Sequence, residues 1–407
     1  MTRFHVVVFG IAAAAAATLG SERVMRGAAP APAPTQKNAA LTDEVPRFEV
    51  DPSWPKPLPH NWAYGNIGGV AVDSKDHIWV LHRPGMAVPE DNFAALDPPA
   101  GECCMPAPPV LEFDAAGNLV QSWGAIHDQK GVLMNKQVWG PMSEVQWPTY
   151  EHGIFVDHKD NVWIDNSNPP SQILKFNRDG SKYLLRIGQA ESKSSNDTTN
   201  LAGAAGIWVD AKANELYVAD GYRNRRVAVF DAETGAYKRH WGAYGKQPPD
   251  GPGGSNPIEG KYNPDGPRSQ QFATLHCITI SKDDLVYACD RVNDRIQVFK
   301  KDGTFVMEEV VAPRTLAFGS VGGIAFSADP DQKFLYVADG VNKKIWIVRR
   351  KDLKAVGSFA QGGHHAGGLA IAHAIATDSK GNVYVGESRG GDRVQRFLYK
   401  GMKKATS

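Results

Sequence analysis

Pairs of short apolar stretches, each pair separated by a polar turn, recur along most of the chain. The first stretch of a pair ends in Asp or Ser, and in most pairs the second ends at an acidic residue. Five or six apolar positions rich in β-branched and aromatic residues are typical of β-strands. Six such pairs can be read, at residues 69–83, 153–166, 206–220, 277–290, 323–339 and 374–387.

Further strands complete each unit. A third apolar stretch follows in most units, as at residues 226–230 and 295–299, and a fourth often ends in an aromatic residue before glycine, as at Trp123 and Trp241. Four short strands joined by tight turns and repeated every 40–50 residues or so are typical of a β-propeller blade. Because one blade cannot bury both of its faces, the six must pack in a ring. The sequence therefore predicts an all-β, six-bladed β-propeller, and its Gly-Ile-x-x-Asp openings resemble the NHL repeat.

The sixth unit lacks an outer strand, because the chain ends soon after Phe397. The segment Arg47–Val50, ahead of the first unit, has the alternation of a strand and can supply it. Closing the ring in this way removes the exposed edge that an open array would carry. We expect a propeller domain at 46–401, closed by an N-terminal strand, and a tail at 402–407.

The N-terminus has the pattern of an export signal. Arg3 precedes an apolar run from Val6 to Leu19 that is short for a membrane span, and Ala15 to Ala17 supply small residues for cleavage. We predict a signal peptide at 1–20, with an uncleaved anchor as the alternative, and an Ala/Pro-rich linker at 21–45. The protein is expected to be secreted or periplasmic, without a membrane span beyond the signal segment.

The charge balance limits the expected partners of the protein, whereas the sequence does not determine how its cysteines pair. The chain has 45 basic and 44 acidic residues, which gives no reason to expect nucleic acid as a partner. Cys103 and Cys104 are adjacent in a Pro-rich insertion, whereas Cys277 and Cys289 lie in expected strands. A disulfide between the strand cysteines, one from the insertion to either strand cysteine, and buried free thiols are all compatible with this placement.

Three of the 12 histidines stand at the same place in alternate units, at the opening of the innermost strand: His152, His276 and His373. The intervening units carry a small residue there: Gly68, Ala205 and Gly322. In a closed ring, three such imidazoles would converge on the central axis. Neutral imidazole is a common zinc ligand, and three protein ligands with an open fourth position describe a catalytic site. We predict a three-histidine zinc site; the alternative is three histidines hydrogen-bonded around a water-filled channel.

Several motifs resemble the peptidyl-α-hydroxyglycine α-amidating lyase family. They are Asp220–Asn224, Cys289–Gln297, the pair His82-Arg83 and the three histidine openings, and the resemblance covers most of residues 65–400. It implies a propeller whose catalytic zinc is held by the three histidines. It also implies an active-site tyrosine at Tyr222 and two active-site arginines at Arg83 and Arg291.

The resemblance also implies a reaction. The family cleaves the N–C bond of a C-terminal α-hydroxyglycine, a carbinolamide, to give an amide and glyoxylate. The substrate would thus be a peptide or small molecule that ends in α-hydroxyglycine. Tyrosine is a weak base at its ordinary pKa, so a neighbouring cation must stabilise the phenolate. Arg291 or Arg83 can do so, and the other arginine can bind the substrate carboxylate through its paired donors.

Some positions depart from the family pattern. Ile371 stands where the family has methionine, and Ala374 replaces an aspartate ligand of a structural calcium, which puts calcium in doubt. The family's two disulfides find no cysteine pairs, because the matching places hold Arg223, Tyr287 and Val298. Two rival functions remain open: a metal-free NHL propeller that binds a peptide or envelope protein, and a zinc lyase or hydrolase acting on another small α-hydroxy acid derivative.

Overall fold

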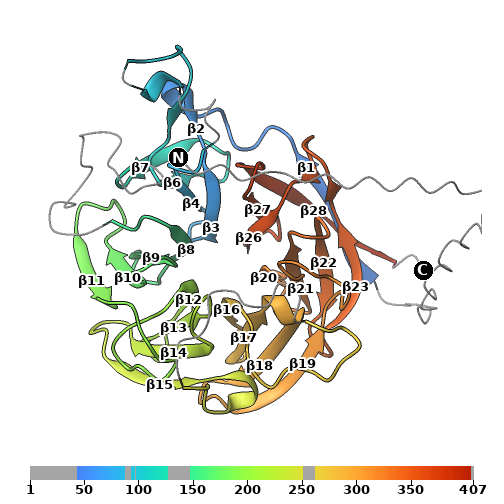
Figure 1. The fold of residues 1–407 in the computed structure, drawn as a ribbon. Helices are drawn as coiled ribbons and strands as arrows, with labels where there is room; N and C mark the ends of the chain where they lie inside the picture. Colours follow the sequence, from blue (N-terminus) through green and yellow to red (C-terminus); the bar gives the residue numbers. More distant parts are fainter. Residues whose placement is uncertain (1–43, 88–92, 97, 127–146, 251–261, 405–407) are drawn as a thin grey trace, which may run out of the picture. The chain divides into compact units, whose positions relative to one another are not determined.

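The computed structural model describes residues 44–87, 93–96, 98–126, 147–250 and 262–404. The predicted signal peptide at 1–20 and most of the predicted linker at 21–45 lie outside the described residues. Within the compact unit Leu41–Thr406, six four-stranded antiparallel sheets are arranged around a common centre, as Figure 1 shows. The all-β, six-bladed propeller expected from the sequence is confirmed.

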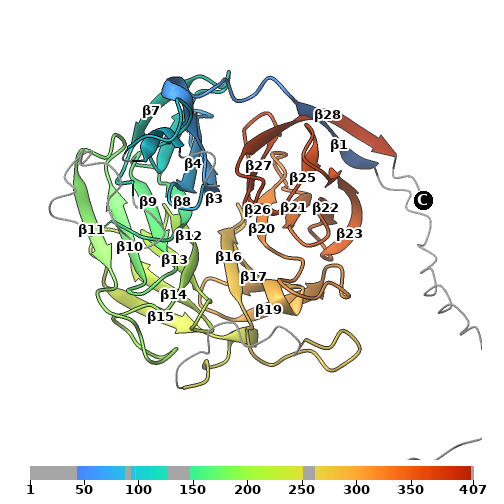
Figure 2. The same cartoon turned by 45° about the horizontal axis from the view of Figure 1, so that its top comes forward.

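Each blade runs from an inner strand at the axis to an outer strand at the rim, and the view in Figure 2 shows the inner strands side by side. In this order the strands are β3 (Asn66–Val72), β4 (Ile78–Arg83), β6 (Val110–Phe113) and β7 (Leu119–Trp123) in blade one; β8 (Glu151–Val156), β9 (Val162–Asn166), β10 (Gln172–Phe176) and β11 (Tyr183–Ile187) in blade two; β12 (Ala204–Asp210), β13 (Glu215–Asp220), β14 (Arg226–Asp231) and β15 (Tyr237–Trp241) in blade three; β16 (Leu275–Ile280), β17 (Leu285–Asp290), β18 (Arg295–Lys300) and β19 (Phe305–Val310) in blade four; β20 (Gly323–Phe326), β21 (Phe334–Asp339), β22 (Lys344–Arg349) and β23 (Lys354–Phe359) in blade five; and β26 (Ala372–Thr377), β27 (Val383–Glu387), β28 (Val394–Lys404) and β1 (Glu44–Asp51) in blade six.

Short elements lie in the connections between blades and within them. Two parallel pairs lie in the connections, β2 (Trp62–Ala63) with β5 (Met105–Pro106) and β24 (Gln361–Gly362) with β25 (Gly368–Leu369). Single 3₁₀ turns are η1 (Pro59–Asn61), η3 (Ala243–Gly245) and η4 (Arg291–Asn293). No helix in the described part of the chain has both the length and the apolarity to cross a bilayer.

The hydrophobic core is divided among the interfaces between blades. Each of six clusters of buried side chains joins two neighbouring blades, including the pair formed by blades six and one. Trp123 at the end of blade one packs 5.3 Å from Phe176 of blade two, measured between ring centroids. Gly180, with φ of +67°, presses against Trp123 so closely that a Cβ would come within 2.3 Å. The turn therefore requires glycine for both its conformation and its packing.

An N-terminal strand closes the ring, as expected. β1 pairs antiparallel with β28 along its length, so residues about 350 positions apart form one sheet edge. The boundaries differ from the expected ones at both ends. β1 begins at Glu44 and buries Val45, inside the range assigned to the linker, and β28 continues to Lys404, inside the range assigned to the tail. The reason is that Val45 pairs directly with Lys403.

The four cysteines form two disulfides. Cys277 of β16 stands opposite Cys289 of β17, and the two form a disulfide. Cys103 and Cys104 form a second one between adjacent residues. Of the alternatives left open by the sequence, the cross-strand link is the one found.

Removing the aromatic contact of the closing strand should weaken the whole ring. The ring of Phe48 stacks on Phe359 at 4.4 Å and meets Tyr336 at 5.1 Å. We expect Phe48→Ala to lower the free energy of unfolding by about 2–3 kcal/mol, measured by urea denaturation. Phe93, which is 39% exposed, offers the matched control, and Phe93→Ala should change stability little. Equal effects of the two substitutions would contradict a closing role for β1.

Candidate active site

Three histidines meet at the centre of the ring. His152, His276 and His373 are each the second residue of an inner strand, β8, β16 and β26. The centroids of their rings lie 4.8 to 5.1 Å apart, and one ring nitrogen of each lies within 4.8 Å of those of the other two. The alternating pattern in the sequence thus corresponds to one cluster that can hold a metal ion.

A β-bulge aims each histidine at the axis. The pairing of β16 with β17 skips His276, and the pairing of β26 with β27 skips His373. The register of β8 shifts across the same position, between Glu151 and Ile154. A bulged residue is unpaired and its side chain is redirected, so the imidazoles leave the faces of their own sheets and enter the channel.

Backbone carbonyls of the following blades fix two of the imidazoles. Nδ1–H of His276 donates to the carbonyl of Gly322 at 2.6 Å, and Nδ1–H of His373 donates to that of Gly68 at 3.0 Å. These carbonyls belong to the small residues that alternate with the histidines in sequence. When Nδ1 carries the bonded hydrogen, the lone pair of the ring is on Nε2, which is the arrangement of metal-binding histidines. Nδ1 of His152 is buried without a partner among the described residues.

The electrostatic surroundings keep the imidazoles neutral. Burial lowers the pKa of His152 well below its usual value, and the other two histidines and the two arginines lower it further. For His276 and His373, burial again acts first, followed by the charges of Arg291 and Arg83 respectively. A neutral imidazole is the form that binds a metal ion.

Tyr222 lies against the histidines. Its hydroxyl is 2.9 Å from Nε2 of His152 and 3.0 Å from Nε2 of His276. The residue belongs to the connection after β13, where its backbone N–H donates to the carbonyl of Gly203. A Cβ on Gly203 would come within 2.5 Å of the Cβ of Tyr222, so this glycine, with φ of +97°, lets the tyrosine approach the axis.

Two arginines stand beside this cluster. Arg291 begins the turn after β17, and its guanidinium lies 5.6 Å from the centre of the Tyr222 ring. Arg83 ends β4, where its Nε donates to the carbonyl of Glu151 at 2.6 Å and its guanidinium lies on the ring of Tyr150. Nη2 of Arg83 and Nε of Arg291 are buried without a hydrogen-bond partner in the described structure. Unsatisfied guanidinium donors of this kind indicate a site for an anion.

Buried ion pairs hold the turns that carry Tyr222 and Arg291. In blade three, Asp220 at the end of β13 accepts from Arg226 at 2.9 Å and from Asn224 at 2.7 Å, with Asp220 and Arg226 fully buried. In blade four, Asp290 accepts from Arg295 at 2.8 Å and from Asn293 at 2.7 Å. We call each of these groups a carboxylate clamp. The same device sets both turns relative to the inner strands.

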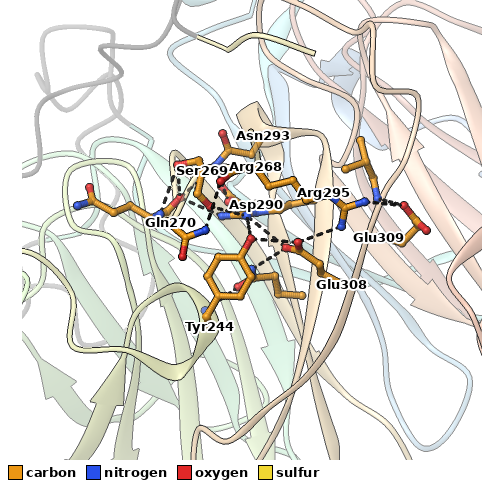
Figure 3. Close-up of polar contacts among 12 residues, drawn as sticks. Tyr244, Arg268, Ser269, Gln270, Asp290, Asn293, Arg295, Glu308 and Glu309 are labelled. Atoms are coloured by element: carbon orange, nitrogen blue, oxygen red, sulfur yellow. Dashed lines mark hydrogen bonds and ion pairs between the residues drawn. The ribbon is translucent and has the colours of Figure 1, made fainter. Parts of the chain in front are cut away.

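The clamp of blade four extends into a larger network, which Figure 3 shows. Arg295 also reaches the hydroxyl of Tyr244 at 2.9 Å, the carbonyl of Ser269 at 2.7 Å and Glu308 at 3.2 Å. Glu308 in turn accepts from Arg268 at 2.9 Å. The segment before β16 is thus tied to the outer strand of its own blade, so the strand that carries His276 and the turn that carries Arg291 share one support.

A cavity of about 210 Å³ opens above the histidines. The connections that follow the second strand of each blade line it, together with His276 and His373. Five of the six predicted site residues line it: His276, His373, Tyr222, Arg83 and Arg291. The sixth, His152, lies directly against Tyr222 and the other two histidines. Ile371, where the resembling family has methionine, also lines the cavity, and Ala374 lies below the histidines on the opposite side.

Sequence reasoning missed other residues in the wall of the cavity, namely Asn66, Tyr150, Phe318 and Arg389. Tyr150 and Phe318 lie in irregular connections that no repeat pattern marks. Arg389, however, follows the second strand of blade six as Tyr222 follows that of blade three. Alignment of these connections by their position in the repeat would therefore have identified Arg389 from the sequence.

A second acidic and histidine cluster lies away from the cavity. Asp73, His77 and Glu112 bring ligand atoms within 4.8 Å of one another. Arg178 donates to Asp73 at 2.6 Å and also bonds Glu112, so a protein cation already balances these carboxylates. This cluster has the features of a structural ion-pair network rather than of a metal site.

Fold and site together define the class of protein: a six-bladed propeller with a three-histidine centre, a tyrosine and arginines at one end of its channel. No family model matches the sequence. A structural genomics protein of unknown function from Bacteroides thetaiotaomicron, 12% identical, superposes with a TM-score of 0.50 over 83% of this chain and 70% of that one. This likeness supports the fold alone.

The sequence relatives are more specific. Peptidyl-glycine alpha-amidating monooxygenase B of Xenopus laevis is 24% identical over 371 residues, which cover 87% of this chain and 36% of that protein. Peptidyl-alpha-hydroxyglycine alpha-amidating lyase 1 of Drosophila melanogaster is 26% identical over 235 residues, 51% of this chain and 40% of the relative. The chain spans well under half of the length of either relative. The predicted resemblance to the amidating lyases is confirmed, and the chain is similar to a family of lyase-like propellers.

Metal analysis can test whether the three-histidine cluster binds an ion. We expect purified protein to contain about one zinc ion per chain, and His276→Ala to lose most of it because two imidazoles bind weakly. His77→Ala, a histidine of the second cluster, should retain the zinc. Loss of zinc from the His77 variant but not from the His276 variant would contradict the assignment.

Proposed function

We propose that the protein is an exported, zinc-dependent carbon–nitrogen lyase. Its substrate would be a peptidyl- or N-acyl-α-hydroxyglycine, and its products an amide and glyoxylate. One observation carries the proposal: three imidazoles converge beside the hydroxyl of Tyr222, within reach of two arginines that have unsatisfied donors. Relatives named as amidating lyases support the same reaction. Export rests on the N-terminal sequence pattern alone.

The residues present fit a zinc ion. His152, His276 and His373 would hold it through Nε2, since Nδ1 of two of them is engaged by backbone carbonyls. When bound, zinc would lower the pKa of a coordinated hydroxyl group, as it does for bound water. A calcium ion is not part of the proposal, because Ala374 offers no carboxylate.

Tyr222 would move the proton. As a phenolate it would take the proton of the substrate hydroxyl, the electrons of that O–H bond would form the carbonyl of glyoxylate, and the C–N bond would break. The amide nitrogen would then receive the proton from Tyr222, which returns the side chain to its starting state. Arg291, with its guanidinium 5.6 Å from the ring, would stabilise the phenolate by its charge.

Arg83 would hold the carboxylate of the hydroxyglycine. Its Nε is fixed by the carbonyl of Glu151, and its stacking on Tyr150 restrains the plane of the guanidinium. The buried Nη2 then remains as a donor for an anion. Binding the carboxylate here would orient the C–N bond relative to Tyr222 and exclude water from one side of the reacting carbon.

A second candidate is a zinc lyase or hydrolase acting on another small α-hydroxy acid derivative. The cavity of about 210 Å³ favours this alternative, because it is small for a peptide substrate. The rival of another class, a metal-free propeller that binds a peptide or envelope protein, predicts no bound zinc and no turnover. Metal content and product release therefore separate the three.

The reaction can be tested directly with α-hydroxyhippurate. We expect the protein to release glyoxylate from this compound above the spontaneous rate. A chelator should abolish the release and added zinc should restore it, because the site is proposed to need the ion. No release by zinc-loaded protein would reject the proposal, and release that persists without metal would reject its zinc dependence.

Substitution of the proposed base should separate chemistry from metal binding. We expect Tyr222→Phe to keep the zinc but to lower kcat by roughly 10²–10⁴-fold, the usual contribution of a general base. Tyr399, 37% exposed on the last strand, provides the control, and Tyr399→Phe should leave kcat unchanged. Turnover of the Tyr222 variant at the wild-type rate would remove this residue from the mechanism.

A further inference from the structure

We propose that Arg389 binds a second carboxylate, carried by the acyl or peptide part of the substrate. The inference rests on the proposed lyase reaction and names the substrate class that the site would prefer, namely α-hydroxyglycines whose N-acyl group ends in an anion. Four features of the structure lead to it: the register of the repeats, the fixed backbone of the turn, the aromatic ring beside the guanidinium, and the lack of an ion pair between Arg389 and any described carboxylate.

The first feature is the register of the repeats. Glu387 ends β27 and accepts from Arg393 at 2.7 Å, six residues later, as Asp220 accepts from Arg226 in blade three. Arg389 follows Glu387 by two residues, as Tyr222 follows Asp220. Blade six thus has its own carboxylate clamp, and Arg389 occupies the place that brings Tyr222 to the cavity.

The second feature is a turn held in an unusual conformation. Arg389 has φ of +52°, a backbone conformation that residues other than glycine rarely adopt. Its backbone N–H donates to Oδ1 of Asn66 at 3.0 Å, and Nδ2 of Asn66 donates to Asp392 at 3.0 Å. Asn66 belongs to blade one, so a neighbouring blade fixes the turn. Such over-determined backbone is found where a side chain has to be presented in one direction.

The third feature is an aromatic support. The guanidinium of Arg389 lies 4.4 Å from the centre of the Phe318 ring, and that of Arg291 lies 6.0 Å from the same ring. Phe318 therefore lies close to both the arginine beside the histidines and the exposed Arg389. Stacking on a ring fixes the plane of a guanidinium and leaves its N–H donors along the edge available for a carboxylate.

The fourth feature is that no carboxylate of the described residues is paired with the guanidinium of Arg389. Among the described residues, no carboxylate forms an ion pair with Arg389, although its side chain lines the cavity and is exposed. Arg223, another arginine of the cavity wall, is paired with Glu191. An exposed, oriented and unpaired arginine at the mouth of an anion-binding cavity suits a ligand carboxylate. In the proposed reaction Arg83 holds the first carboxylate and Arg291 stabilises the phenolate, so Arg389 would take a second carboxylate.

A pair of near-isosteric substrates tests the inference. N-glutaryl-α-hydroxyglycine carries a distal carboxylate, and N-glutaramoyl-α-hydroxyglycine carries a neutral amide in its place. We expect the wild type to favour the glutaryl compound by about tenfold in kcat/KM, the size of one partly exposed charge-assisted contact. Arg389→Gln should bring this ratio close to one, and Arg389→Lys should keep part of it. Arg314→Gln, which removes an exposed arginine paired with Asp265, is the control and should leave the ratio unchanged.

Either of two outcomes overturns the proposal: a wild-type ratio near one, or a ratio near ten that persists in Arg389→Gln. Binding measurements separate such a failure from failure of the lyase reaction. Calorimetry on zinc-loaded protein should show glutarate binding about tenfold more tightly than glutaramate in the wild type, and equal binding in Arg389→Gln. If no glyoxylate is released but this difference is found, the reaction is wrong and the second carboxylate site stands.

Discussion

Contact between the six inner strands is the constraint on which the rest of the structure depends. Each inner strand touches the next, and β26 touches β3, so the circle is complete. Among the described residues, each of the six hydrophobic clusters joins two blades. A blade therefore has no stable core of its own, and the stability of the ring and the geometry at its axis are one property.

The site uses this closed circle in two ways. The imidazoles bulge from alternate strands, and the blades between them offer a backbone carbonyl at the same level, as Gly68 does for His373 and Gly322 for His276. Many of the residues that line the cavity belong to the connection that follows the second strand of a blade. There, Asp220, Asp290 and Glu387 each bond an arginine a few residues ahead.

Repetition of one clamp explains why different chemistry can share one scaffold. The clamp fixes the backbone of the turn, whereas the residues within the turn do not contribute to the ion pair. One blade can thus present a tyrosine, another an arginine beside the three histidines, and a third an exposed arginine of the cavity wall. The cost of burying charge at each clamp is offset because the carboxylate accepts from two or more donors. In blade six, for example, Glu387 accepts from Arg393, Gln395 and the backbone of Ala370.

The sequence by itself determined the number of blades, the alternation of His152, His276 and His373, and the positions of Tyr222, Arg83 and Arg291 in their units. These features are periodic, and a period can be read along the chain without knowledge of contacts. Only the tertiary structure decided what depends on distant partners. The bulges that aim the histidines, the pairing of Val45 with Lys403, and the meeting of Arg389 with Phe318 all join segments that local pattern cannot relate.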